Sequence, residues 1–150
     1  MAPNLRETPT LRLLRALHRA PRRIERVDGA GIALHGLQRA EFDVVATLGN
    51  TEGLRMGELA SRMLTSPANV TRLVKALEKR GLVRRERSRT SDREVVARLT
   101  ARGAALFERS YPAQVEYLRA AFEARLTPRQ QETLIDLLGR LEDLPSAEDG

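Results

Sequence analysis

The sequence predicts a mostly helical chain with one small β-hairpin, an α+β fold class, and three observations support this prediction. Apolar residues recur at helical spacing over most of the 150 residues. Two short segments near the middle alternate apolar and polar residues, as half-buried strands do. Aromatic residues make up only 3% of the chain and tryptophan is absent, so the core must come mainly from Leu, Val, Ala and Met, which favours helices. We expect a single domain over residues 1–150.

The first expected helix runs from Thr10 to about Val27. It carries an apolar stripe of Leu11, Leu14, Leu17, Ile24 and Val27. Pro21 is expected to kink or divide this helix, because proline cannot donate a backbone hydrogen bond. Residues 28–36 are rich in glycine and are expected to form a loop.

Three helices are expected next, at residues 37–48, 55–64 and 66–80. The second and third are short and joined by a tight link at Leu64–Thr65. Ser66 is a suitable N-cap, and Pro67 suits the first helical position. Gly81 is a suitable residue to end this helix. Val70, Leu73, Val74 and Leu77 form its expected buried stripe.

The predicted hairpin consists of strands at residues 82–87 and 94–99, joined by a polar turn. A long helix follows, capped by Thr100 and expected to bend near Pro112 before it ends at about residue 126. A capping box at Thr127–Gln130 then opens the last helix, which reaches about residue 144.

The positive charge of the chain is concentrated in one segment. The net charge of the chain is +6. Residues 72–93 contain nine basic and three acidic residues, so the net charge of this segment equals that of the whole chain. A local positive surface of this kind attracts phosphate backbones. The alternative is a merely solvated surface, which remains open for Arg80, Arg84 and Arg85.

Two short helices followed by a basic hairpin form a winged helix-turn-helix, whose second helix enters the major groove of DNA. Arg72 suits guanine, whereas Asn69 either contacts adenine or caps its own helix. Lys75 and Lys79 lie further along the helix and are better placed for phosphates. The predicted recognition-helix contacts are Ser66, Pro67, Ala68, Asn69, Thr71, Arg72 and Lys75. The predicted wing contacts are Arg87, Arg89 and Arg93, at the backbone or the minor groove.

An ordered set of short motifs resembles the MarR-type (multiple antibiotic resistance) regulators over roughly residues 10–145. These motifs are Leu37–Phe42, Gly57–Ala60, Val70–Val74, Leu77–Val83, Asp92–Arg93 and Leu99–Gly103. The resemblance implies a homodimer built from the first, fifth and sixth helices. It also implies binding to a pseudo-palindromic operator, usually to repress nearby genes, with release by a small and often aromatic or phenolic ligand.

The wing departs from the pattern of that family, in which one residue separates an Asp from an Arg. Here Asp92 and Arg93 are adjacent, and the hairpin is one residue shorter than usual. Counting back from Leu99 places Arg93 in the wing-arginine register and Ser91 at the Asp position. The resemblance therefore does not imply the Asp–Arg contact that usually braces the wing of that family.

The residues themselves also favour a dimer, because the terminal helices carry more leucine than one small winged domain can cover. The alternative is that these leucines pack within one subunit. The dimerisation helices are expected at about residues 10–27 and 101–145, and the DNA-binding region at about 37–100. For an effector pocket, the candidate lining residues are Arg15, His18, His35 and Phe42, each of which also has a purely structural or solvated interpretation.

Several function classes are disfavoured by composition. The chain has no cysteine and two histidines, which argues against thiol redox chemistry, a metal site or a cofactor. We identify no catalytic residues, because the sequence offers no nucleophile–base pair and no phosphate-binding glycine loop. There is no membrane-length apolar run and no secretory signal, so we expect a cytoplasmic protein. The alternative function is a winged module that binds protein or RNA; a monomer in solution would favour it.

Overall fold

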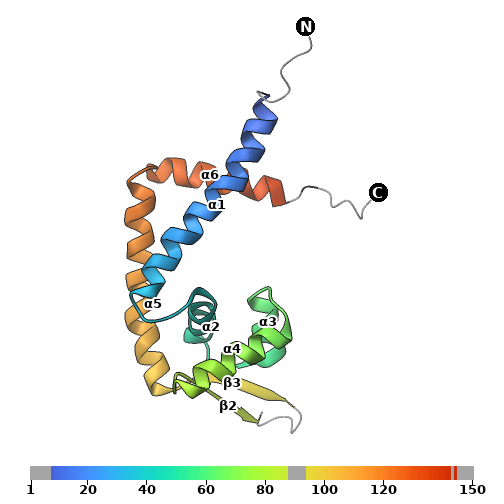
Figure 1. Cartoon of the computed structure of the whole chain (residues 1–150), viewed down its shortest axis with the longest axis vertical. Coiled ribbons are helices and arrows are strands. Elements are labelled where there is room, and N and C mark those ends of the chain that lie inside the picture. The colour runs from blue at the N-terminus through green and yellow to red at the C-terminus, as the bar shows by residue number, and fades with distance from the viewer. Residues whose placement is uncertain (1–7, 88–93, 143, 145–150) are drawn as a thin grey trace.

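The computed structural model describes residues 8–87, 94–142 and 144. Long helices occupy one end of the molecule, and a small unit of shorter helices and a sheet occupies the other (Figure 1). The elements in chain order are α1 (Pro9–Ala33), α2 (Arg39–Gly49), β1 (Leu54–Arg55), α3 (Met56–Arg62), α4 (Pro67–Lys79), β2 (Val83–Arg87), β3 (Val95–Leu99), α5 (Ala101–Glu123) and α6 (Pro128–Glu142). This arrangement confirms the predicted fold class, mostly α with a small β wing.

The first helix is longer than the sequence predicts. It continues through Pro21 without dividing and includes most of the segment expected to be a loop. The cause is tertiary packing at Gly31, which is buried against Gln114 and Tyr117 of α5 and leaves no room for a side chain. Here glycine permits close helix packing instead of a turn. The actual turn is short and uses Gly36, at φ +70°.

The helix-turn-helix follows the predicted local signals closely. Helix α2 begins with a capping box in which the Gln38 amide donates to the Glu41 carboxylate at 2.9 Å. Helix α4 begins as predicted, since the Ser66 hydroxyl accepts from the Asn69 amide at 3.2 Å. In the link between α3 and α4, Leu64 adopts a left-handed backbone at φ 50° and is 94% exposed.

The sheet has three antiparallel strands in the order β1–β3–β2. Strands β2 and β3 form the predicted hairpin, with Val83 opposite Leu99 and Arg87 opposite Val95. Strand β1 is an additional two-residue strand that the sequence analysis placed partly in a helix. It anchors the hairpin at the middle of β3, because Leu54 is buried and pairs with Ala97.

The core lies between α2, α4 and the sheet. Helix α4 buries the four residues predicted for its stripe, and Leu77 and Val74 are fully covered. Phe42 of α2 stacks on Tyr111 of α5, with ring centroids 6.4 Å apart, and so joins this core to the long helices.

Helices α5 and α6 begin at the predicted caps. The Thr100 hydroxyl accepts from the Gly103 amide at 3.0 Å, and the Thr127 amide donates to the Gln130 side chain at 2.8 Å. Helix α5 remains one helix across Pro112. Helix α6 fully buries none of its described residues within the protomer; Leu134, Leu137 and Leu138 stay exposed, and Leu141 is half-buried.

Candidate nucleic-acid interface

Helix α4 separates its apolar and polar sides cleanly. Its four buried residues contact the core, while Ala68, Arg72, Lys75 and Lys79 are exposed on the other side. Ser66 and Pro67, at the start of the helix, are also exposed. Thr71 is half-buried at the edge, and its hydroxyl donates to the Pro67 carbonyl at 2.9 Å. An exposed polar side at the start of a helix is the geometry that major-groove recognition needs.

Asn69 does not cap the helix through its side chain, since Ser66 supplies the capping oxygen. Its side-chain amide donates to the Thr65 hydroxyl at 3.0 Å, and its carbonyl oxygen accepts from the Arg72 guanidinium at 2.8 Å. This chain of contacts holds the Arg72 side chain beside the helix start. Sequence reasoning missed Thr65, although its position four residues before Asn69 places both on one side of the turn.

A groove of about 500 Å³ runs between α4 and β2. It is lined by Arg72, Lys75, Ala76, Glu78, Lys79 and Arg85. Within the described part of the chain, no carboxylate pairs with Lys75 or Lys79. Their ammonium groups are therefore available to phosphate oxygens along this groove.

Two arginines of the basic segment are used inside the fold. Arg85 contacts Glu78 through its guanidinium at 2.8 Å, and the Arg85 amide donates to the same carboxylate at 2.9 Å. These contacts fix strand β2 against α4, so the wing and the recognition helix form one unit. Arg80 donates to Glu41 at 3.0 Å and to the Gly36 carbonyl at 2.8 Å, which ties the end of α4 to the start of α2.

The described part of the wing carries one predicted contact, Arg87, which is exposed at the end of β2. The strands of the hairpin are braced by an ion pair between Arg55 of β1 and Glu94, at the loop end of β3, at 3.0 Å and by another between Arg98 and Glu86. The other predicted wing contacts, Arg89 and Arg93, lie outside the described residues. Ser91 and Asp92 do too, so the departure from the Asp–Arg pattern stays a prediction from the sequence.

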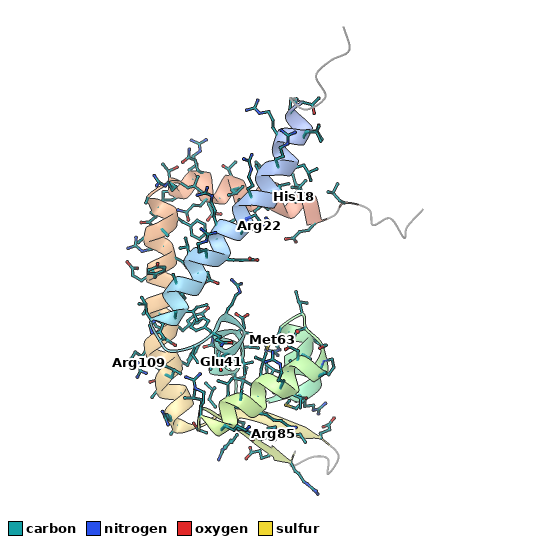
Figure 2. The ribbon with its side chains drawn as sticks, in the orientation of Figure 1. His18, Arg22, Glu41, Met63, Arg85 and Arg109 are labelled. Atoms are coloured by element: carbon teal, nitrogen blue, oxygen red, sulfur yellow. The ribbon has the colours of Figure 1, made fainter. Side chains whose placement is uncertain are left out.

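The four candidate pocket residues do not form one cluster within the protomer. Arg15 and His18 are exposed on the first half of α1, whereas His35 follows the end of that helix. A helix rises about 1.5 Å per residue, so His18 lies roughly 22 Å from the end of α1 at Ala33, after which His35 follows. Phe42 is buried on α2 (Figure 2 labels its neighbour Glu41).

A polar joint connects α1, α2 and α5. Gln114 of α5 donates to the Asp28 carboxylate at 2.7 Å and to the Asp28 carbonyl at 3.0 Å, and Asp28 also pairs with Arg39. The Gln114 side-chain oxygen and the Ser110 hydroxyl are buried without a hydrogen-bond partner among the described residues. Burial raises the pKa of the nearby Asp43 carboxyl, Arg39 lowers it, and Asp28 raises it further.

In residues 8–87, 94–142 and 144, no three His, Cys, Asp or Glu side chains are grouped so that they could hold a metal ion. None of the helices in that same part of the chain is both long enough and apolar enough to cross a bilayer.

Comparison with known proteins relates the chain to a family of transcriptional regulators. The model of the MarR family matches residues 37–95. The chain is 36% identical over 112 residues to the HTH-type transcriptional repressor Rv2887 of Mycobacterium tuberculosis, an alignment that covers 75% of this chain and 80% of that protein. It is 33% identical over 104 residues to the uncharacterised HTH-type transcriptional regulator YkoM of Bacillus subtilis, with 69% and 67% covered.

Among solved structures, the fold is similar to that of Sco3205 from Streptomyces coelicolor, a MarR family transcriptional regulator crystallised in complex with DNA. The TM-score is 0.80 at 29% identity, with 95% of this chain and 96% of that chain covered. A second Streptomyces coelicolor regulator of that family, AbsC, gives a TM-score of 0.81 at 23% identity, with 91% and 94% covered. The latter likeness concerns the fold alone.

Proposed function

Because the chain belongs to the MarR family of transcriptional regulators, we propose that it is a homodimeric repressor that binds a pseudo-palindromic operator and is released by a small aromatic or phenolic ligand. The observation that carries this proposal is the exposed polar side of α4, which lies beside a cationic groove and a hairpin fixed to it by Arg85. A related fold has been crystallised with DNA, which supports a duplex as the partner.

In the proposed complex, α4 enters the major groove with its first turn at the base edges. Arg72 contacts guanine, and Asn69 both orients Arg72 and contacts adenine. Ala68 and Thr71 lie where they can touch thymine methyl groups. Lys75 contacts phosphate, as Lys79 does, and Ser66 and Pro67 hold the helix start near the backbone. Arg87, with Arg89 and Arg93, contacts the adjacent backbone or minor groove.

The proposed dimer interface consists of α1, α5 and α6. Its support is the apolar surface that these helices leave uncovered, including Leu14 (46% exposed), Val115 (52%) and Leu137 (49%). Exposed apolar surface of this extent along adjoining helices marks an interaction site. With two-fold symmetry each α4 reads one half-site, and half-sites one turn apart lie about 34 Å from each other.

For ligand release, we propose that the effector binds where the long helices meet the winged unit. Phe42 lies there, stacked on Tyr111, and the buried oxygens of Ser110 and Gln114 can accept a hydrogen bond from a phenol hydroxyl. His35, just after the end of α1, remains a candidate for this pocket, whereas Arg15 and His18 lie on the distant first half of α1. Screening phenolic acids for loss of operator binding tests the proposal, and a Gln114→Leu variant that still binds DNA should lose the response.

The DNA-binding role is tested by titrating the protein into DNA from upstream of its own gene at increasing salt. If about eight phosphates are contacted, affinity should fall by orders of magnitude between low and moderate salt. Arg72→Ala should reduce discrimination between the operator and random DNA, whereas Arg87→Ala should weaken binding to both alike. Salt-independent binding, or equal effects of the two variants on both DNAs, would contradict this assignment of roles.

A further inference from the structure

Helix α1 carries a continuous arginine face. Its six members are Arg12, Arg15, Arg19, Arg22, Arg23 and Arg26, all exposed. At 100° per residue, these side chains occupy only about 100° of the helix circumference, on the side opposite Leu14, Leu17 and Ile24. The face is about 21 Å long, because each residue rises about 1.5 Å. The sole acidic residue between Arg12 and Arg26 is Glu25, which lies outside it.

Charge summed over the whole chain conceals this face. Residues 72–93 carry a net charge equal to the total of +6, so the basic and acidic residues of the rest of the chain are equal in number. Within that remainder, residues 10–27 carry +5, and the opposite charge is spread over other segments. The protein therefore has two basic surfaces, of which the sequence analysis identified one.

The fold itself does not use the arginine face. In the part of the chain that the structure describes, none of its six guanidinium groups pairs with a carboxylate, and Arg19 donates only to the Arg15 carbonyl at 3.3 Å. By contrast, the arginines of α5 and α6 include Arg119 and Arg140, which pair with acidic residues of their own helices. Like charges one turn apart destabilise a helix, so the stability of this fold does not explain the face.

The arginine face is also separate from the DNA-binding surface. The first half of α1 and the β2–β3 hairpin lie far apart in the molecule, as His18 and Arg85 illustrate (Figure 2). A straight duplex seated on α4 and the hairpin therefore does not run along α1. The apolar side of α1 is the one proposed for the dimer, so the arginine face stays open when the dimer forms.

We propose that the arginine face binds the phosphate backbone of a second DNA duplex, so that one dimer bridges two DNA segments. Guanidinium groups form paired hydrogen bonds with phosphate oxygens, and a straight row of them matches a regular row of phosphates. Arg12, Arg15 and Arg19 lie next to one another on an open part of this surface, where an anion can contact more than one of them. The contact needs no particular base sequence.

A capture assay tests this bridging, and it rests on the proposed function because the bait is the operator. Operator duplex is fixed to beads, loaded with the protein and washed, and a labelled duplex of unrelated sequence is added. Wild-type protein should retain the second duplex at moderate salt. Arg15→Gln/Arg19→Gln should retain the operator but lower capture by about tenfold or more, because two phosphate contacts are lost.

The matched control is Arg119→Gln/Arg140→Gln, which removes the same charge from two arginines that already have carboxylate partners. Capture by this control should equal that of wild type, with dimer formation checked by sedimentation for both variants. Wild-type protein that holds the operator without capturing a second duplex would overturn the bridging proposal and leave the proposed function standing. So would equal losses in both double variants.

A direct titration tests the arginine face even if no operator duplex is found for the capture assay. Binding of the unrelated duplex is followed in solution with salt in an Arg72→Ala/Arg87→Ala background, which weakens binding through α4 and the hairpin. In this background the magnitude of the slope of log affinity against log salt should decrease by about 2 when Arg15→Gln/Arg19→Gln is added. An unchanged slope overturns the proposal whether or not an operator is found. Stronger binding of the arginine face to vesicles of anionic lipid or to an acidic peptide than to the duplex also overturns it.

Discussion

At the scale of single residues, two glycines of α1 have opposite roles. A β-carbon on Gly31 would lie 2.3 Å from the Gln114 side-chain oxygen and 2.7 Å from the Tyr117 ring, whereas one on Gly29 would meet nothing within 4 Å. Gln114 cannot easily move away, because it is buried and bonded to Asp28. Gly31 is thus required for packing, and Gly29 is not.

We therefore expect Gly31→Ala to lower the free energy of unfolding by about 1–3 kcal/mol through overpacking. Gly29→Ala should raise it by up to about 1 kcal/mol, because alanine favours a helix interior more than glycine does. Chemical denaturation of both variants measures the difference. A loss of stability in Gly29→Ala equal to that in Gly31→Ala would show that close packing is not the cause.

Asp43 is a second residue whose effect on the stability of the fold can be predicted. Burial raises the pKa of its carboxyl above 3.8, Arg39 opposes this, and Asp28 adds repulsion. The folded chain thus holds this proton more tightly than the unfolded chain. The contribution of Asp43 to the stability of the fold therefore falls as the pH rises from about 3.8 through the raised pKa. Above that pKa the carboxylate is charged, and its burial destabilises the fold fully.

Asp43→Asn should therefore be more stable than wild type at pH 7, and its advantage should shrink as the pH is lowered toward 4. Urea unfolding of both proteins across this range provides the comparison. An advantage that is constant with pH would assign the effect to something other than the charge of this carboxyl.

At the scale of elements, α2 connects the winged unit to the long helices. It contacts α4 through Glu41 and Arg80, α1 through Arg39 and Asp28, and α5 through the Phe42–Tyr111 stack. The Arg80 contacts matter most for α4, because they hold its end against the start of α2 and the preceding turn.

Arg80→Gln should reduce the free energy of unfolding by about 1 kcal/mol, since the pair is partly exposed and only its inner carboxylate is well covered. Lys79→Gln is the matched control, because it removes the same charge one residue away without a carboxylate partner in the described structure; it should change stability by less than about 0.5 kcal/mol. Thermal unfolding at two salt concentrations checks both. Equal losses would attribute the effect to net charge instead of to this contact.

The elements that could be predicted from the sequence are those with local signals at both ends. Helix α4 has Ser66 and Pro67 at its start and Gly81 after its end, and its four buried residues follow a helical period. The second half of α1 could not be predicted, because Gly29 and Gly31 are local signals for a loop, and only packing on α5 shows that they are helical. Strand β1 has two residues and pairs with a strand some forty positions later.

The same distinction between local signals and contacts among distant residues holds for the candidate DNA-binding site. The exposure of Arg72 and Lys75 follows from helical periodicity, so their placement was predictable. The contacts of Asn69 with Thr65 and Arg72 depend on side-chain conformations that a pattern of residue types does not contain. The Arg85–Glu78 contact joins a strand to a helix, and each residue alone has the pattern of an ordinary solvated charge.

At the scale of the whole molecule, the long helices extend away from the winged unit and leave a large apolar surface (Figure 1). Helix α6 shows this best, since Leu134, Leu137 and Leu138 are each at least 40% exposed on one side of the helix. Ile135 is 63% exposed but lies about 100° away from the middle of that stripe. The two positions therefore distinguish a specific interface from general surface hydrophobicity.

Leu138→Lys should weaken the proposed dimer by about 100-fold or more, because an ammonium group without a partner would be buried in the interface. Ile135→Lys should leave the dimer intact, since its side chain points away from the stripe. Sedimentation at several concentrations measures both. If Leu138→Lys yields monomers, its operator footprint should also shrink from two half-sites to one, because each α4 reads a single half-site. A monomeric wild type, or equal weakening by both variants, would mean that α6 does not form the interface.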